Sequence, residues 1–211
     1  MVDKKNIDYS LYLVTDTDLC PREDLLDTVL NAINGGVSLV QLREKDISSR
    51  EFYNEALAIK KITDAKAVPL IINDRLDIAL AIDADGLHIG QTDLPATVAR
   101  RILGNDKILG LSASNVDEAK KAVLDGADYL GVGAVFPTTT KKDAHDVGVE
   151  MLKDVRKIIK VPIVGIGGIN VENLPQIYGT HIDGISVISA IMGKSDPYSA
   201  SKQLKEMVKN L

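Results

Sequence analysis

The sequence predicts an α/β protein with the (β/α)8, or TIM-barrel, fold, formed by a single domain over residues 1–211. Eight short apolar, β-branched runs recur along the chain, and helical patterns separate them. The runs are nearly continuous rather than alternating, as expected for parallel strands that are covered on both faces. Eight repeats in 211 residues leave about 26 residues for each, close to the minimum for a βα unit.

The eight apolar runs define the predicted strands in order. They lie at residues 11–14, 37–42, 69–72, 86–89, 108–111, 129–136, 161–166 and 184–188. No Pro-rich or Gly-rich linker and no shift in composition divides the chain, which favours one domain. A doubly wound open sheet is the alternative, and it would require some of these runs to be helices or core segments instead.

Capping signals mark the predicted helices between the strands. Residues 48–51 and 115–118 each have the spacing of a capping box, in which a polar side chain and a Glu three residues later satisfy backbone amides. Glycines at 35–36 and at 126 predict helix ends. Asp196 followed by Pro197 predicts the start of the last helix, because Pro suits the first helical turn.

Composition and charge exclude several kinds of partner. The formal net charge of −5 and the pI near 5.2 argue against a nucleic-acid partner, which usually requires a basic face. No stretch approaches the roughly 18 continuous apolar residues of a membrane span, and the N-terminus lacks a signal-peptide core. We therefore expect no membrane partner and a cytoplasmic location. Cys20 is the only cysteine, and a small buried filler is a better interpretation than a reactive thiol.

Basic and amide side chains alternate where the second predicted strand ends. Alternation places Gln41, Arg43 and Lys45 on one side of the extended chain and Glu44 on the other. Two cations on the inner face of a barrel are unfavourable without an anion to meet, and Arg and Lys are the usual partners of phosphate oxygens. The alternative is a surface pair between one of these cations and Glu44 or Asp46, which we consider the weaker interpretation.

Two aspartates follow neighbouring predicted strands and indicate a metal site. Asp74 follows the third strand and Asp93 the fourth, so barrel closure can bring their carboxylates together. Two carboxylates, waters and substrate phosphates are the ligands that Mg²⁺ takes. Helix N-capping is the alternative for each Asp alone, and it is strongest for Asp93, which precedes Leu94 and Pro95.

Hydroxyl and ammonium groups cluster after the sixth predicted strand. Thr138, Thr140 and Lys141 belong to the segment 137–143, which delivers three hydroxyls and two ammonium groups to the end of a buried run. Such a loop provides the donors and positive charge that a pyrophosphate requires. An ordinary polar loop is the alternative, and this segment alone does not separate the two.

The last two repeats and the fifth complete a ring of polar groups. Glycines 167 and 168 follow the seventh strand, where backbone amides can approach a phosphate, and Ile188 and Ser189 follow the eighth. Ser112 follows the fifth strand. The cleft is therefore expected to hold two anion subsites, one cationic and suited to a pyrophosphate, the other neutral and suited to a monophosphate. The three histidines show no metal-ligand spacing.

These motifs, in this order, resemble the thiamine-phosphate synthase (thiamine-phosphate pyrophosphorylase) family. The resemblance covers nearly the whole chain, and residues 12–16 resemble that family's first strand. The motifs that carry it are Gln41-x-Arg43-x-Lys45, Asn73-Asp74-Arg75, Gly90-Gln91-x-Asp93-Leu94-Pro95, Pro137-Thr138-x-Thr140-Lys141 and Gly165-Ile166-Gly167-Gly168.

The resemblance implies a Mg²⁺-dependent transferase of thiamine biosynthesis. It would join 4-amino-2-methyl-5-hydroxymethylpyrimidine diphosphate to a thiazole phosphate, after dissociative loss of pyrophosphate. The implied binding residues for the pyrimidine diphosphate are Gln41, Arg43, Lys45, Asn73, Ser112 and Lys141, of which Arg43, Lys45, Lys141 and Ser112 are also the catalytic candidates. The implied residues for the thiazole phosphate are Thr138, Thr140, Gly168, Ile188 and Ser189, and those for Mg²⁺ are Asp74 and Asp93.

Two alternatives accompany this assignment. A thiazole tautomerase-like relative would keep only the second subsite, and the presence of Arg43, Lys45 and both aspartates weighs against it. A non-catalytic binder of thiamine phosphates is the other alternative. The sequence does not fix the oligomeric state, and a homo-oligomer is one of the expected outcomes.

Overall fold

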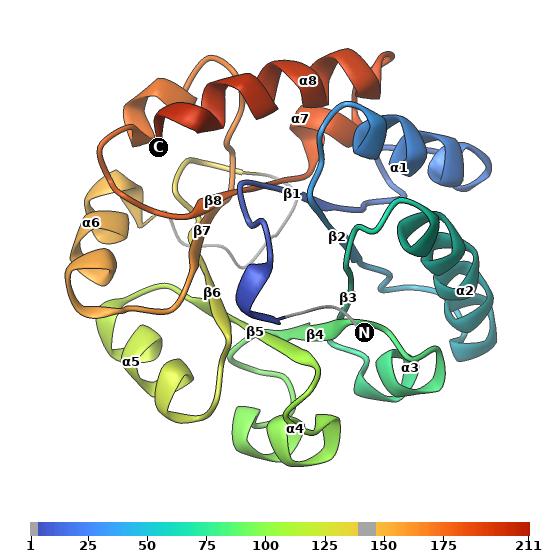
Figure 1. Ribbon diagram of the computed structural model, residues 1–211, viewed down its shortest axis with the longest axis horizontal. Helices are drawn as coiled ribbons and strands as arrows, with labels where there is room; N and C mark the ends of the chain where they lie inside the picture. Colours follow the sequence, from blue (N-terminus) through green and yellow to red (C-terminus); the bar gives the residue numbers. More distant parts are fainter. Residues whose placement is uncertain (1–3, 139–146) are drawn as a thin grey trace.

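Eight parallel strands close into a barrel in the order in which they occur along the chain (Figure 1). The computed structural model describes residues 4–138 and 147–211. Each strand pairs with its sequence neighbours, and β1 closes the barrel against β8 through Tyr12 opposite Ser186. The predicted (β/α)8 fold is therefore confirmed, and the open-sheet alternative is wrong.

The strands lie close to the predicted positions. They are β1 (Leu11–Val14), β2 (Leu39–Leu42), β3 (Leu70–Asn73), β4 (Gly86–Ile89), β5 (Ile108–Ala113), β6 (Tyr129–Val132), β7 (Ile163–Ile166) and β8 (Gly184–Val187). The sixth strand ends at Val132, four residues before the predicted end. Gly133 lies against the carbonyl of Ile166, where an added Cβ would come within 1.9 Å of the oxygen.

Helices surround the barrel on its outer side (Figure 1). The α-helices are α1 (Leu25–Asn34), α2 (Ser49–Ala65), α3 (Leu76–Ala81), α4 (Ala96–Leu103), α5 (Val116–Leu124), α6 (Gly148–Ile158), α7 (Ser189–Met192) and α8 (Pro197–Met207). The short 3-10 helices are η1 (Lys4–Asn6), η2 (Arg22–Asp24), η3 (Leu174–Ile177) and η4 (Val208–Asn210). Only η3 lies between β7 and β8, so the expected helix of the seventh unit is replaced by one tight turn. Left-handed positions at Gly167, Gly168, Gly179 and His181 interrupt the helical backbone on both sides of η3.

The predicted capping signals explain where the helices start. The Ser48 side chain accepts a hydrogen bond from the amide of Glu51, whose carboxylate accepts from the amide of Ser48, so this capping box is confirmed. At α5 the prediction is half right. Asn115 caps the amide of Glu118, but the Glu118 carboxylate accepts from the amide of Ser114 instead.

Two apolar layers hold the barrel. The larger layer packs between the strands and the helices. The smaller fills the barrel interior and consists of Tyr9, Tyr12, Leu39, Ile71, Ile108, Tyr129 and Val164, with Ile7 packed against it. The N-terminal segment crosses the opening at the amino ends of the strands (Figure 1), where Lys4 Nζ lies 2.8 Å from Asp128 Oδ1. This end is therefore covered, and the opposite end carries the loops that follow the strands.

We predict that Gly110→Ala destabilises the protein by about 1–3 kcal/mol, the usual cost of overpacking a core. A Cβ at this position would lie 2.2 Å from the ring of Tyr129, which is fully buried and cannot move aside. Urea unfolding followed by circular dichroism measures the change. Leu124→Ala, at a side chain that is 86% exposed, is the control and should change stability by less than about 0.5 kcal/mol. Equal stability of Gly110→Ala and the parent protein would contradict this packing argument.

Candidate active site

The candidate residues within the described chain lie at, or shortly after, the carboxyl ends of the strands. Because the barrel is closed and wholly parallel, these ends share one rim. Gln41 lies in β2, Asn73 ends β3, and Ser112 lies near the end of β5. Thr140 and Lys141 lie outside the described residues, so the geometry of the rim is built from the others.

The basic triplet alternates as predicted. Gln41 is buried and donates to the hydroxyl of Tyr12 inside the barrel at 2.7 Å. Lys45 forms an ion pair with Asp74, whereas Glu44 turns away and accepts from Arg22 at 2.9 Å. The surface pair between a cation of the triplet and Glu44 is therefore not what the structure forms.

The loop after β1 supports Arg43. The Arg43 amide donates to the hydroxyl of Thr15 at 3.0 Å, and its guanidinium lies 3.5 Å from the carboxylate of Asp16. The second distance is long for a charge-assisted bond, which is usually below about 3 Å. The Asp16 carboxylate thus restrains a guanidinium that can still turn toward a ligand. Asp16 was not predicted from the sequence as a site residue.

Asp74 and Asp93 approach each other at the rim. Burial and the neighbouring Asp74 carboxyl raise the pKa of Asp93 above its ordinary value, and a hydrogen bond from the Gly90 amide and the charge of Lys45 oppose that rise. Asp74 adopts a left-handed backbone with φ of 58°, a conformation that Asp tolerates better than most residues. Neither side chain caps a helix, since Arg75 and Pro95 occupy the N-cap positions of α3 and α4.

This carboxylate pair fits Mg²⁺ by its chemistry. Two close carboxylates repel each other, and a divalent cation between them would relieve that repulsion. Over residues 4–138 and 147–211, no cluster of three or more His, Cys, Asp or Glu side chains could form a protein-only metal cage. Mg²⁺ prefers a pair of carboxylates to such a cage, because it keeps several waters and takes its remaining ligands from substrate phosphates.

Three side chains beneath the rim were not predicted from the sequence. Tyr12, His88 and Tyr129 are buried in the barrel and hydrogen-bonded to one another or to the candidate residues. His88 Nε2 lies 3.0 Å from the Ser112 hydroxyl. The signal was present, since His88 stands between Leu87 and Ile89 and must point to the opposite face of the strand from both.

The second expected subsite is described in part. The loops after β6 and β7 pack together, because Gly168 is left-handed and a Cβ there would lie 2.5 Å from the carbonyl of Pro137. Thr138 belongs to the first of these loops. Ser189 is exposed at the start of α7, directly after Ile188. The structure thus brings Thr138 and Gly168 to adjoining loops and places Ile188 and Ser189 after the next strand.

Arg75 serves the scaffold. Its guanidinium donates to both carboxylate oxygens of Asp77 and to Ser49, and it lies 5.9 Å from the centre of the Phe52 ring. These contacts join the starts of α2 and α3. Within residues 4–138 and 147–211, the Arg75 guanidinium therefore bonds to Asp77 and Ser49 rather than to the candidate metal ligands Asp74 and Asp93.

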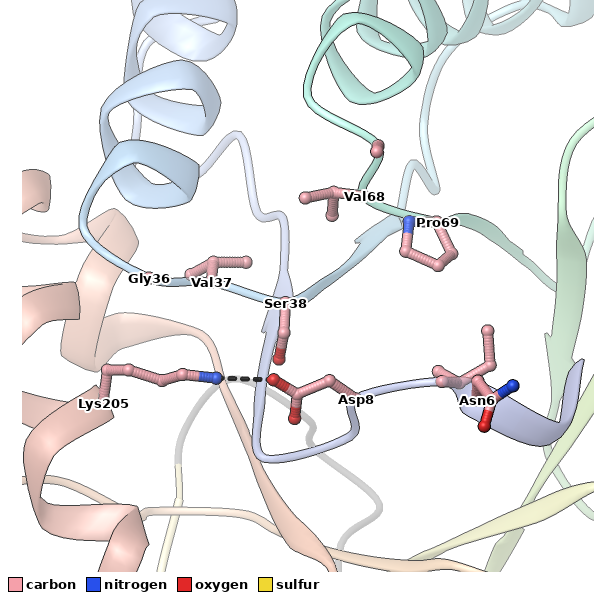
Figure 2. Close-up of a pocket in the computed structure, with 10 residues that line it drawn as sticks. Asn6, Asp8, Gly36, Val37, Ser38, Val68, Pro69 and Lys205 are labelled. Carbon is pink, nitrogen blue, oxygen red and sulfur yellow. Dashed lines mark hydrogen bonds and ion pairs between the residues drawn. The ribbon is translucent and has the colours of Figure 1, made fainter. Parts of the chain in front are cut away.

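A cavity of about 400 Å³ lies at the other end of the barrel (Figure 2). Its lining includes Ser38 and Pro69, which precede β2 and β3, and the ion pair of Asp8 with Lys205 at 2.8 Å. Barrel chemistry belongs to the loops that follow the strands rather than to those that precede them. The cavity is therefore separate from the candidate site.

Comparison with known proteins identifies the family. A family described as thiamine monophosphate synthase matches residues 11–191. The chain belongs to the thiamine monophosphate synthase family.

Individual relatives agree with this assignment. A thiamine-phosphate synthase of Clostridium tetani is 56% identical over 95% of this chain and 96% of its own length. Another thiamine-phosphate synthase, from Methanobrevibacter smithii, is 54% identical over 94% of this chain and 95% of its own length. The solved structure of thiamine phosphate pyrophosphorylase from Pyrococcus furiosus superposes with a TM-score of 0.89 at 38% identity, over 96% of each chain. The resemblance stated from the motifs is confirmed, and with it the assignment as a transferase of thiamine biosynthesis.

Within the described ranges, no helix combines the length and apolar character that crossing a bilayer requires. 

A second pair of carboxyls in this family member lies behind the basic triplet. Arg22 donates to Glu44 at 2.9 Å and to Glu55 at 2.5 Å, and both carboxyls are nearly buried. Burial and the charge of Glu44 raise the pKa of Glu55 to about 7, although Arg22 opposes the rise. Each carboxyl also has one buried oxygen without a hydrogen-bond partner among the described residues. A proton on Glu55 provides the donor that this pair needs.

We predict that this pair makes stability fall as pH rises from about 4.5 to about 7. The folded pKa of Glu55 lies above its ordinary value of 4.5, so the folded state binds the proton more tightly than the unfolded chain. The stabilisation is complete below the ordinary value and is lost as pH rises through the folded pKa. Glu55→Gln keeps a donor without titrating, so it should flatten this slope and be the more stable protein at about pH 8.

Thermal unfolding midpoints across that pH range measure the slope. Glu150→Gln, at a side chain 78% exposed on α6, is the matched control and should keep the parent slope. A Glu55→Gln protein with an unchanged slope would remove Glu55 as its cause.

Proposed function

We propose that the chain joins 4-amino-2-methyl-5-hydroxymethylpyrimidine diphosphate to a thiazole phosphate, giving thiamine phosphate and pyrophosphate. One observation carries the proposal. The cations of Arg43 and Lys45 and the carboxylates of Asp74 and Asp93 gather at one rim of the barrel. A leaving diphosphate develops negative charge, and fixed cations together with a divalent ion stabilise that charge. Membership of the family supports the same reaction.

The pyrimidine diphosphate lies against β2, β3 and β5 in this proposal. Arg43 binds the diphosphate through its planar fork and Lys45 through a compact charge. Lys141, outside the described residues, adds a third cation. Gln41, Asn73 and Ser112 supply the neutral polar groups that orient the pyrimidine ring.

The thiazole phosphate occupies the rim of β6, β7 and β8. Thr138 and Thr140 donate hydroxyl hydrogens, and Gly168 lets backbone amides approach the phosphate because it has no side chain. Ile188 and Ser189 complete the subsite. A monophosphate is the suitable ligand, since backbone and hydroxyl donors bind it without further formal charge.

Asp74 and Asp93 hold Mg²⁺ in this proposal. When bound, Mg²⁺ neutralises charge on the diphosphate oxygens and polarises them as a Lewis acid. Lys45 pairs with Asp74 in the structure and lies beside the carboxylates. It can therefore turn to the diphosphate when the carboxylates bind the metal.

The reaction breaks the C–O bond between the pyrimidine methylene and the diphosphate. The bonding electron pair leaves with the diphosphate, and the pyrimidine ring stabilises the resulting cation. The thiazole nitrogen then donates its lone pair to the methylene carbon and forms the new C–N bond. The chain contributes by holding both substrates at adjoining positions on one rim, which replaces a bimolecular encounter with a local one.

The proposal includes one domain over residues 1–211 and a cytoplasmic location. Cys20 is a free, buried thiol beside Thr28, with 3.3 Å between sulfur and hydroxyl oxygen. A chain with one buried thiol is suited to a reducing compartment.

We predict that Asp74→Asn lowers Mg²⁺-dependent turnover by on the order of a hundredfold or more, because one metal-binding carboxylate is lost. Pyrophosphate release from the two substrates at varied Mg²⁺ measures the effect, and the parent protein must itself release pyrophosphate. Asp77→Asn, the same change at an exposed carboxylate three residues away, is the control. Full activity of Asp74→Asn at low Mg²⁺ would overturn the metal assignment.

Arg43→Lys should weaken binding of the pyrimidine diphosphate by about tenfold, because an ammonium keeps the charge but loses the planar fork. Isothermal titration with the pyrimidine diphosphate measures the affinity. Arg75→Lys provides the comparison, since Arg75 binds Asp77 and Ser49 instead. Unchanged affinity in Arg43→Lys would remove the bidentate role.

A further inference from the structure

Five side chains form a continuous hydrogen-bonded chain through the barrel interior. Gln41 Nε2 lies 2.7 Å from the Tyr12 hydroxyl, which lies 2.8 Å from that of Tyr129. The Tyr129 hydroxyl is 2.8 Å from His88 Nδ1, and His88 Nε2 is 3.0 Å from the Ser112 hydroxyl. The two ends of this polar chain, Gln41 and Ser112, are among the residues proposed to orient the pyrimidine ring.

The middle of the polar chain is closed to bulk water. Tyr12, Tyr129 and His88 are 1%, 0% and 8% exposed. Burial raises the pKa of both tyrosines above the ordinary value, so each hydroxyl keeps its hydrogen at neutral pH. Gly110 and Gly131 provide the space, since a Cβ would lie 2.2 Å from the Tyr129 ring and 3.3 Å from the His88 ring.

Each phenol has one hydrogen to donate, and both hydrogens find an acceptor within this polar chain only when the donors follow one another in a single direction. The Gln41 amide nitrogen donates to Tyr12. Tyr12 then donates to Tyr129, and Tyr129 donates to His88 Nδ1. A neutral His88 therefore carries its hydrogen on Nε2 and donates to Ser112. The Ser112 hydroxyl hydrogen is left to point toward another acceptor.

The direction of the polar chain links the chemistry of its two ends. With this direction, Gln41 presents its carbonyl oxygen beyond the polar chain, and Ser112 presents a donor. The reverse direction would require the Gln41 amide to rotate and every hydrogen to move to the other side, giving a Gln41 donor and a Ser112 acceptor. A mixed state would leave a buried hydroxyl hydrogen without an acceptor in the polar chain or place two hydrogens against each other, and both are unfavourable.

We propose that Tyr12, Tyr129 and His88 are positioning residues that make Gln41 an acceptor and Ser112 a donor, and thereby select an aminopyrimidine over an oxopyrimidine. This inference rests on the proposed function, which places the pyrimidine between these two ends. An exocyclic amino group donates to the Gln41 carbonyl. An oxo group is itself an acceptor, so the two oxygens would repel each other with no hydrogen between them. Sites built around buried polar groups discriminate in this way, because the wrong ligand leaves a partner unpaired.

Tyr129→Phe tests the inference, because it removes one hydroxyl from the centre of the polar chain and keeps the ring. The quantity to measure is the ratio of kcat/KM for the 4-amino pyrimidine diphosphate to that for its 4-oxo analogue. We expect this ratio to fall by about tenfold or more. The reason is that Gln41 would no longer be held as a hydrogen-bond acceptor toward the pyrimidine. Tyr12→Phe, which cuts the polar chain one step earlier, should lower the ratio in the same direction.

Tyr9→Phe is the matched control. Tyr9 is buried in the same cluster, with its ring 5.1 Å from that of Tyr129, so the change has the same chemistry and a similar setting. We expect it to leave the ratio unchanged. If Tyr129→Phe and Tyr12→Phe lower kcat/KM for both substrates equally, the residues are only structural and the inference fails.

Nitrogen-15 NMR of the histidine rings gives a readout that needs no turnover. In the parent protein His88 should be the Nε2–H tautomer, with its signals assigned by their loss in His88→Gln. Tyr129→Phe should shift this tautomer population, and Tyr9→Phe should not. The inference would be overturned if His88 in the parent protein were protonated on Nδ1 alone, or if Tyr129→Phe left its tautomer population unchanged. Absence of pyrophosphate release by the parent protein would instead count against the proposed function.

Discussion

Closure of eight parallel strands is the constraint on which the other features of this protein depend. Each strand satisfies its backbone hydrogen bonds with two neighbours, so the carboxyl ends of all eight must share a rim. Gln41, Asn73 and Ser112 come from three strands, yet this geometry directs them to one region. Covering the opposite end with the N-terminal segment leaves the strand ends as the place where polar chemistry can collect (Figure 1).

The rim gathers charge of both signs in a way that favours a polyanion with a metal ion. Burial of Asp93 and the nearby Asp74 carboxyl make a second negative charge unfavourable there, and both raise the pKa of Asp93. Lys45 offsets this cost through its pair with Asp74, while Arg43 is held loosely by Asp16. A bound cation and a diphosphate would exchange these internal pairs for stronger ones. The strand alternation that sends Glu44 to Arg22 keeps a competing carboxylate away from the rim.

Polar groups inside the barrel obey a stricter rule than those at the rim. A buried hydroxyl or imidazole must find its partners among other buried groups, so Tyr12, Tyr129 and His88 bond to one another and to the two candidate residues above them. Glycines 110 and 131 leave the room that these rings occupy. The interior thus links residues of β1, β2, β4, β5 and β6. The direction of its hydrogen bonds couples the donor and acceptor roles of residues that are far apart in sequence.

The sequence alone determined the order of strands, the capping box of α2 and the alternation of Gln41, Arg43 and Lys45, because these depend on local periodicity and on neighbours a few residues away. It also predicted that Asp74 and Asp93 lie close together, since neighbouring strands of a barrel are adjacent in space. The tertiary structure decided the rest. Tyr12 and Tyr129 are 117 residues apart, and their contact depends on barrel register, which no local pattern contains. The early end of β6 and the support of Arg43 by Asp16 likewise follow from packing between distant segments.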